Sequence, residues 1–136
     1  MQRLLLVDPS HIIRKVGRNL FGGFGFEVFD ACNLFEAKEF CKKEPLPDYI
    51  IVDESIDDVL EFISSIRRMP LGMDVFIYYL LVEVDFEKMI SGAKSGANSF
   101  LLKPFNRKTL QFAMRDLPQM KKIEDTEATS YNMNQA

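Results

Sequence analysis

The chain has 136 residues, of which 47% are hydrophobic and 27% are charged, and its formal net charge is −3. This length and composition are typical of one globular domain with a sizeable core. The negative charge disfavours nucleic acid as a partner, and no apolar run is long enough to span a membrane. Cys32 and Cys41 lack the spacing of a zinc site, and His11 is the only histidine, so we expect reduced thiols in a cytoplasmic protein.

Apolar strands and amphipathic helices alternate in the first half of the chain. A buried strand at residues 2–7 precedes a helix that Ser10 can cap, and glycines at positions 22, 23 and 25 end this helix. A second strand ends near Asp30, and a second helix covers residues 33–43. A turn at residues 44–48 then leads to a third apolar strand at residues 49–53. The expected buried stripe of the first helix comprises Ile12, Ile13, Val16 and Leu20.

The same alternation continues through the second half. After a helix with apolar residues at positions 59, 62, 63 and 66, a fourth strand covers residues 75–81. A fourth helix, with apolar residues at positions 86, 89, 90 and 93, stops at Gly96. The fifth strand covers residues 99–102, and the last helix has Leu110, Ala113, Met114 and Leu117 on its apolar side.

Five strand–helix units with apolar strands predict an α/β fold in which helices cover both faces of a parallel sheet. Right-handed crossovers leave few topologies, and five strands favour the flavodoxin-like (βα)5 sandwich with strand order 2-1-3-4-5. We expect residues 1–119 to form this domain. Residues 120–136 are polar and predict a C-terminal tail that is either mobile or a fraying helix.

Charged residues follow three of the predicted strands: Asp8, Asp53 and Lys103. Because the carboxyl ends of parallel strands meet at one edge of the sheet, we expect these side chains to lie close together. Two adjacent carboxylates repel each other, and a magnesium ion would relieve this conflict while binding phosphate oxygens. A lysine can also pair with a phosphate. The pattern predicts a magnesium-assisted phosphoryl site with a carboxylate nucleophile, although a single aspartate of this kind is more often a cap or turn residue.

Three segments of the chain, LLLVD, PDYIIVD and SGANSFLLKPF, resemble in order and separation the motifs of the response-regulator receiver domain, the family of the chemotaxis response regulator. The resemblance covers about residues 2–118. It implies that Asp53 accepts a phosphoryl group, that Lys103 pairs with the acyl phosphate, and that Asp8 helps to hold magnesium. It also implies that Phe100 is the aromatic switch residue and that the Lys103–Pro104 peptide bond is cis.

Three features depart from the family's pattern. Pro9 replaces the second acidic residue of the metal site, and Leu81 replaces the hydroxyl-bearing switch residue. The loop after Asp53 is shorter than usual, and Ser55 takes the position whose backbone carbonyl binds the metal. These departures imply that magnesium binds weakly through Asp8, Asp53 and Ser55.

Three nearby carboxylates could replace the missing acid. Glu54 is adjacent to Asp53, but the alternation of side chains along a strand favours an outward direction for it. Asp57 and Asp58 could reach the site from the shortened loop, although both are more typical of helix caps or solvated residues.

We expect an atypical single-domain response regulator rather than a conventional enzyme. It would receive a phosphoryl group on Asp53 from a histidine kinase or phosphotransfer protein and would signal through a partner protein. The surface for that partner would be the fourth helix, fifth strand and fifth helix, around residues 86–117. The protein could also form a homodimer. The first alternative is a phosphorylation-independent pseudo-receiver, in which Asp53 and Lys103 form a structural ion pair. The second is a flavodoxin-type cofactor carrier, which residues 8–13 do not support because they lack a phosphate-binding loop rich in Ser, Thr and Gly.

Overall fold

The computed structural model describes residues 1–122 and contains a five-stranded sheet with the order β2-β1-β3-β4-β5. Every pair of neighbouring strands is parallel, so the predicted flavodoxin-like topology is confirmed. The carboxyl ends of all five strands therefore lie along one edge of the sheet. The strands are β1 (Arg3–Val7), β2 (Glu27–Ala31), β3 (Tyr49–Asp53), β4 (Phe76–Leu81) and β5 (Ser99–Leu102).

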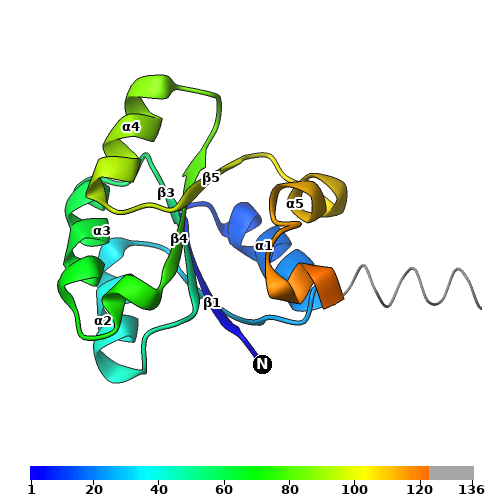
Figure 1. The fold of residues 1–136 in the computed structure, drawn as a ribbon, viewed down its shortest axis with the longest axis horizontal. Coiled ribbons are helices and arrows are strands. Elements are labelled where there is room, and N and C mark those ends of the chain that lie inside the picture. The colour runs from blue at the N-terminus through cyan, green and yellow to red at the C-terminus, as the bar shows by residue number, and fades with distance from the viewer. Residues whose placement is uncertain (123–136) are drawn as a thin grey trace, which may run out of the picture.

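Helices cover both faces of this sheet, with α1 and α5 on one side and α2, α3 and α4 on the other (Figure 1). At the starts of α1, α2, α4 and α5, the N-cap side chain accepts a hydrogen bond from the backbone N–H three residues on, as expected for N-caps. Ser10 caps α1 in this way, as predicted. No helix in the described part of the chain is both long and apolar enough to cross a bilayer. The helices are α1 (His11–Gly23), α2 (Leu34–Lys43), α3 (Val59–Arg68), α4 (Phe86–Ser95) and α5 (Arg107–Ala113).

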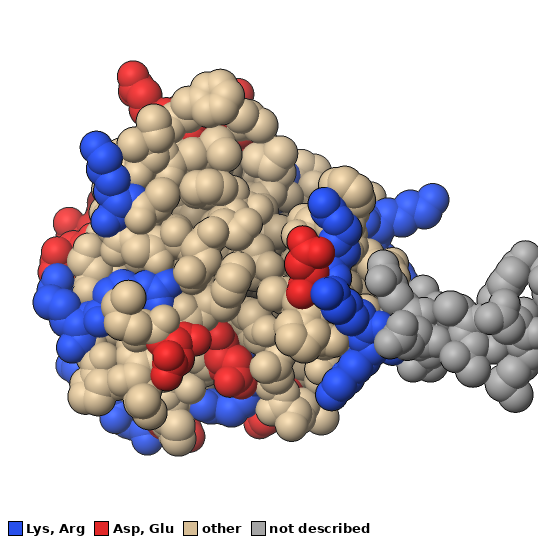
Figure 2. Space-filling view, viewed as in Figure 1, with Lys and Arg blue, Asp and Glu red and all other residues tan. Residues whose placement is uncertain are grey.

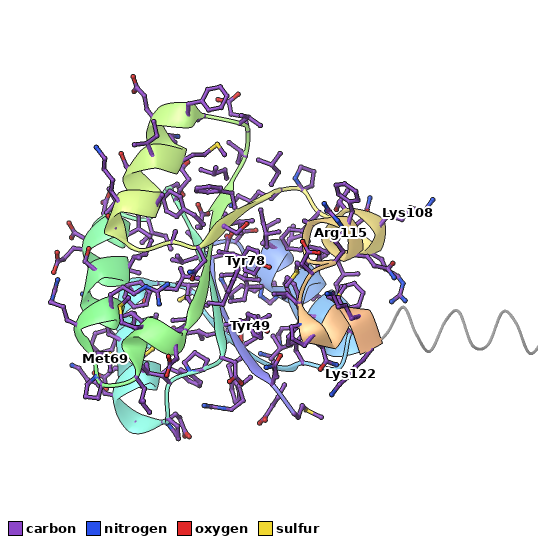
Figure 3. All side chains as sticks on the ribbon, viewed as in Figure 1. Tyr49, Met69, Tyr78, Lys108, Arg115 and Lys122 are labelled. Atoms are coloured by element: carbon purple, nitrogen blue, oxygen red, sulfur yellow. The ribbon has the colours of Figure 1, made fainter. Side chains whose placement is uncertain are left out.

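The sheet separates two hydrophobic layers because successive strand residues point to opposite faces. Tyr49 and Tyr78 project toward α1 and α5 (Figure 3), where they join a layer rich in aromatic rings. Phe62 and Ile63 of α3 pack in the other layer, together with Leu81 at the end of β4. These layers bury the three central strands β1, β3 and β4 almost completely, whereas the edge strands β2 and β5 are partly exposed.

The apolar stripe predicted for α1 is partly wrong. Ile12 is 71% exposed and Val16 is 38% exposed, whereas Gly17 and Phe21 are the buried residues of this helix. A Cβ atom on Gly17 would lie 2.4 Å from Leu6 Cδ2, so glycine lets the helix approach β1 closely. The helix therefore contacts the sheet through Gly17 and Phe21, and Ile13 and Leu20 of the predicted stripe are partly buried against the same layer.

The contact between α4 and the sheet also differs from the prediction. The apolar residues Phe86 and Ile90 are 74% and 55% exposed, and Gly92 is the buried residue of the helix. A Cβ atom on Gly92 would lie 2.6 Å from the ring of Tyr79. The helix therefore approaches the sheet through glycine and leaves large apolar side chains on the surface.

The last predicted helix is interrupted. Helix α5 ends at Ala113, and a turn precedes a second helical segment that begins at Pro118. A proline disfavours helical backbone in the residue before it and suits the first turn of a helix, which explains the break. Met120 is buried and Gln119 Nε2 donates to the Phe24 carbonyl over 2.8 Å, so the core extends to the start of the expected tail. Residues 123–136 of that tail lie outside the described residues.

Candidate functional site

Asp8, Asp53 and Lys103 meet at the carboxyl edge of the sheet, as their positions after β1, β3 and β5 predict. Lys103 Nζ lies 2.6 Å from Asp53 Oδ2 and 2.9 Å from Asp8 Oδ2. Asp8 is fully buried, Asp53 is 3% exposed, and the Lys103 side chain is 15% exposed. A single ammonium group thus bridges two buried carboxylates, and the site retains a net negative charge.

Tight turns hold the second oxygen of each carboxylate. The Ser10 backbone N–H donates to Asp8 Oδ1 over 2.8 Å, and the Ser55 backbone N–H donates to Asp53 Oδ1 over 2.8 Å. In both turns an aspartate bonds the backbone two residues further on, which is a typical use of this side chain. The two carboxylates are therefore fixed in orientation as well as in position. The peptide bond between Lys103 and Pro104, at the end of β5, is cis, as predicted.

The hydrogen bonds of the site favour its ionised form. Burial alone would raise the pKa of Asp53, but the hydrogen bonds from Lys103 and Ser55 and the charge of Lys103 together lower it. Burial would likewise lower the pKa of Lys103, yet its bonds to Asp53 and Asp8 raise it. At neutral pH Asp53 is a carboxylate, which is the form that a nucleophile requires.

The donor set for a cation is small. Mg²⁺ commonly binds one or two protein carboxylates and completes its shell with water and phosphate oxygens, so Asp8 and Asp53 meet this minimum. Pro9 offers no side-chain ligand, and among residues 1–122 no group of three or more metal-ligating side chains occurs. Ser55 lies in the loop after β3 and contacts Asp53 through its N–H group.

The carboxylates that could replace the missing acid lie elsewhere. Glu54 Oε1 accepts a hydrogen bond from Lys88 Nζ of α4 over 3.0 Å, so the expected outward direction of Glu54 holds. Asp57 and Asp58 are exposed. Asp58 stands at the start of α3 with a left-handed φ of 65° and makes no capping hydrogen bond with its side chain.

The two residues expected at the switch positions, Leu81 and Phe100, lie on neighbouring strands. Leu81 ends β4, is 1% exposed, and packs in the apolar layer beneath α3. Phe100 of β5 is half-buried against the same layer and is paired in register with Tyr79. Burial and the negative charges of Glu54 and Asp53 raise the pKa of Tyr79. Because residue 81 is a leucine, the end of β4 presents no hydroxyl group at this position.

Lys88 is a charged residue near the site that the sequence did not reveal. Its pairing with Glu54 joins α4 to the loop after β3, and the two residues belong to no local motif. The hydrogen bond and charge of Glu54 raise the pKa of Lys88, so it is a cation at neutral pH. A predicted outward direction for Glu54 was the available hint, but it did not identify a partner.

Comparison with known proteins places this architecture in a family. Residues 4–115 match the model of the response regulator receiver domain, and the chain belongs to this family. Response regulator MprA from Mycobacterium ulcerans (strain Agy99) is 30% identical over 93% of this chain. The chain spans 54% of that relative's length.

Solved structures give the same assignment. Chemotaxis response regulator CheY4 of Vibrio cholerae has 31% identity and a TM-score of 0.77, over 85% of this chain and 97% of that one. The receiver domain of sensor histidine kinase PA1611 from Pseudomonas aeruginosa PAO1 has the same fold, with 24% identity and a TM-score of 0.72 over 84% of this chain and 95% of that one. That structure has a magnesium ion coordinated in its active site cleft.

Proposed function

We propose that this protein is an atypical receiver that accepts a phosphoryl group on Asp53 from a histidine kinase or phosphotransfer protein. The observation that carries this proposal is the buried Asp53 carboxylate with Lys103 Nζ 2.6 Å away. The carboxylate is ionised and fixed in orientation, and the ammonium is in place to neutralise an arriving phosphoryl group. The protein acts as a signalling component rather than as a conventional enzyme.

The transfer step follows from these residues. An oxygen of Asp53 attacks the phosphorus of a phosphohistidine, and a P–O bond forms as the P–N bond breaks. The imidazole nitrogen keeps the electron pair of the broken bond and takes up a proton from water. Lys103 remains beside the new acyl phosphate and pairs with its oxygens.

Asp8, Asp53 and the Ser55 backbone carbonyl are the proposed ligands for Mg²⁺, in line with the magnesium-containing receiver domain of Pseudomonas aeruginosa. The ion would supply positive charge that neutralises the transferred group. Binding is weak because Pro9 contributes no carboxylate, and because Lys103 already engages one oxygen of each aspartate.

The output partner is a protein that docks on the surface of α4, β5 and α5. Figure 2 shows that the surface over β5 and α4 is largely free of charged side chains, whereas Lys and Arg gather over α5. Figure 3 labels Lys108, which belongs to α5, and Arg115, which lies in the turn just after this helix. A second copy of the chain is the other occupant that fits this surface. The exposed apolar residues on the surface of α4, β5 and α5 include Phe86, Ile90, Leu102 and Phe112.

The pseudo-receiver alternative is favoured by one observation, the apolar Leu81 at the switch position. The decisive test incubates the protein with acetyl phosphate and Mg²⁺ and records its intact mass, with Asp53→Asn as the control. The proposal expects one phosphoryl group on the wild type and none on the control. An unmodified wild type at saturating donor and metal would establish the pseudo-receiver function instead.

A further inference from the structure

A hollow of about 600 Å³ lies between the start of α3 and α4, beside the loop after β3. The two helices pack side by side on the same face of the sheet (Figure 1). Its lining contains one ammonium group, that of Lys88, and aliphatic surface from Ile56 and Leu60. Carboxylates outnumber this ammonium, so the hollow is strongly negative. They belong to Glu54, Asp57, Asp58 and Glu61.

The hydroxyl of Tyr79 opens into this hollow from β4. Tyr79 is 3% exposed, and its ring packs in the apolar layer beneath α4. Among residues 1–122 its hydroxyl has no hydrogen-bond partner, and no side-chain oxygen or nitrogen of these residues is both sealed from solvent and unpaired. Since Tyr79 lines the hollow, the small accessible part of this residue is its hydroxyl. Burial and the charges of Glu54 and Asp53 raise the pKa of Tyr79, so the hydroxyl is neutral at physiological pH.

The packing of Tyr79 does not require a hydroxyl. A polar group that folding removes from water without giving it a partner opposes folding, and a phenylalanine would fill the same space in the layer. Tyr49 on the other face of the sheet shows the usual arrangement, because its hydroxyl donates to Gln2 Oε1 over 3.0 Å. An unpaired hydroxyl beside a group of carboxylates is suited to a ligand that supplies hydrogen-bond donors to both.

Two carboxylates of the hollow are free to bind such a ligand. Glu54 and Glu61 each pair with a basic side chain. Asp57 and Asp58 are exposed and form no ion pair with any residue that the structure describes, and the Asp58 side chain does not cap α3. The described side chains include no group of three or more that could hold a metal ion. These features favour an organic cation over a metal ion as the ligand.

We propose that the hollow binds an arginine side chain of a partner protein, with the guanidinium between Asp57, Asp58 and the Tyr79 hydroxyl. A guanidinium presents five N–H donors in one plane and can bind a carboxylate through two hydrogen bonds, and a hydroxyl oxygen can accept another. The aliphatic stem of the arginine would cover the apolar part of the lining. A lysine ammonium is more strongly hydrated and lacks this planar array of donors. The exposed aspartates make the hollow open to a side chain that projects from another protein. This site does not depend on a phosphoryl group at Asp53.

The test titrates the unmodified protein with the peptide acetyl-Gly-Arg-Gly-amide and follows the backbone amides by NMR. The amides of residues 54–61 should shift, and higher salt should weaken binding because exposed charges are screened. The same peptide with citrulline in place of arginine keeps the shape without the charge and should cause no shift, and the lysine peptide should bind more weakly. Tighter binding of free arginine than of the peptide would show that the hollow serves a small molecule, which would overturn the assignment to a partner.

Tyr79→Phe removes the hydroxyl and keeps the ring. It should weaken binding of the arginine peptide about five-fold, as loss of one hydrogen bond implies, without lowering the stability of the fold to urea. Tyr78→Phe is the matched control, since Tyr78 is equally buried but belongs to the layer on the opposite face of the sheet. This control should bind the peptide as the wild type does.

The double variant Asp57→Asn, Asp58→Asn tests the carboxylates and should weaken binding of the arginine peptide about ten-fold. Glu27→Gln with Asp116→Asn removes the same charge from exposed positions outside the hollow and should change the affinity little. Equal shifts with the arginine and citrulline peptides would overturn the inference. Equal affinities of the wild type, Tyr79→Phe and the aspartate double variant would overturn it as well.

Discussion

The ammonium of Lys103 lies between two buried carboxylates, 2.6 Å from Asp53 and 2.9 Å from Asp8. Lys103→Met would leave two negative charges facing each other without a cation. Breaking a buried ion pair is strongly destabilising, but the Lys103 side chain is 15% exposed, so water relieves part of the penalty. We expect the free energy of unfolding to fall by about 1–3 kcal/mol.

Urea unfolding at neutral pH measures this loss, and Lys94→Met on the exposed side of α4 is the matched control. Adding Asp8→Asn to Lys103→Met should restore part of the stability, since one of the two unpaired charges is removed. Equal stability of the wild type and Lys103→Met would show that the ammonium does not stabilise the site.

Asp53 makes the stability of the fold depend on acid pH. Burial opposes its ionisation, but the bonds from Lys103 and Ser55 prevail and lower its pKa, whereas in the unfolded chain the pKa is about 3.9. The folded state therefore binds fewer protons at acid pH, and the stability from Asp53 is complete above the unfolded value. It is lost as the pH falls through the folded value. Urea unfolding from about pH 5 to pH 2 should show a shallower loss of stability for Asp53→Asn than for the wild type; equal slopes would contradict this.

Pro9 supplies no carboxylate to the proposed metal site. The residue is exposed at the start of the loop after β1, so an aspartate can replace it without disturbing the core. Pro9→Asp should raise the affinity for Mg²⁺ by about ten-fold or more, since Mg²⁺ prefers carboxylate oxygens. Calorimetric titration of both proteins measures this change. An unchanged affinity would mean that Pro9 is not the cause of weak binding.

At the scale of the elements, the parallel sheet was predictable because strands buried on both faces read as continuous apolar runs, and right-handed crossovers left few possible strand orders. The contact faces of α1 and α4 were not, since both helices approach the sheet through glycines, Gly17 and Gly92, and periodicity counts large apolar residues. Asp8, Asp53 and Lys103 were predictable from their places after strands. The Glu54–Lys88 pair was not, because it depends on how α4 lies over the loop after β3.

Gly92 sets how closely α4 approaches the sheet. A methyl group there would lie 2.6 Å from the Tyr79 ring, so Gly92→Ala must displace the helix or the ring. We expect a loss of about 1–3 kcal/mol in the free energy of unfolding, typical of overpacking. Gly22→Ala in α1 has open space around its new methyl group and should be neutral or stabilising by up to about 1 kcal/mol. Urea unfolding measures the change in stability of both variants. Equal effects of the two substitutions would show that the contact between Gly92 and the Tyr79 ring is not tight.

At the scale of the whole molecule, the proposed phosphoryl site and the proposed docking surface lie on the same fold. The carboxyl edge of the sheet holds Asp53 and Lys103, and a loop leads from the end of β4 at this edge to the start of α4 (Figure 1). The apolar surface of α4, β5 and α5 continues from there.

The central claim is an intact phosphoryl acceptor served by a weakened metal site. The most direct test is the rate at which Asp53 gains a phosphoryl group from acetyl phosphate, followed by intact mass over a range of Mg²⁺ concentrations. The account predicts slow modification that Asp53→Asn abolishes, at a rate that keeps rising with Mg²⁺ up to concentrations at which Pro9→Asp is already saturated. Modification at the same rate without Mg²⁺, or an Asp53 that stays unmodified at every Mg²⁺ concentration, would contradict it.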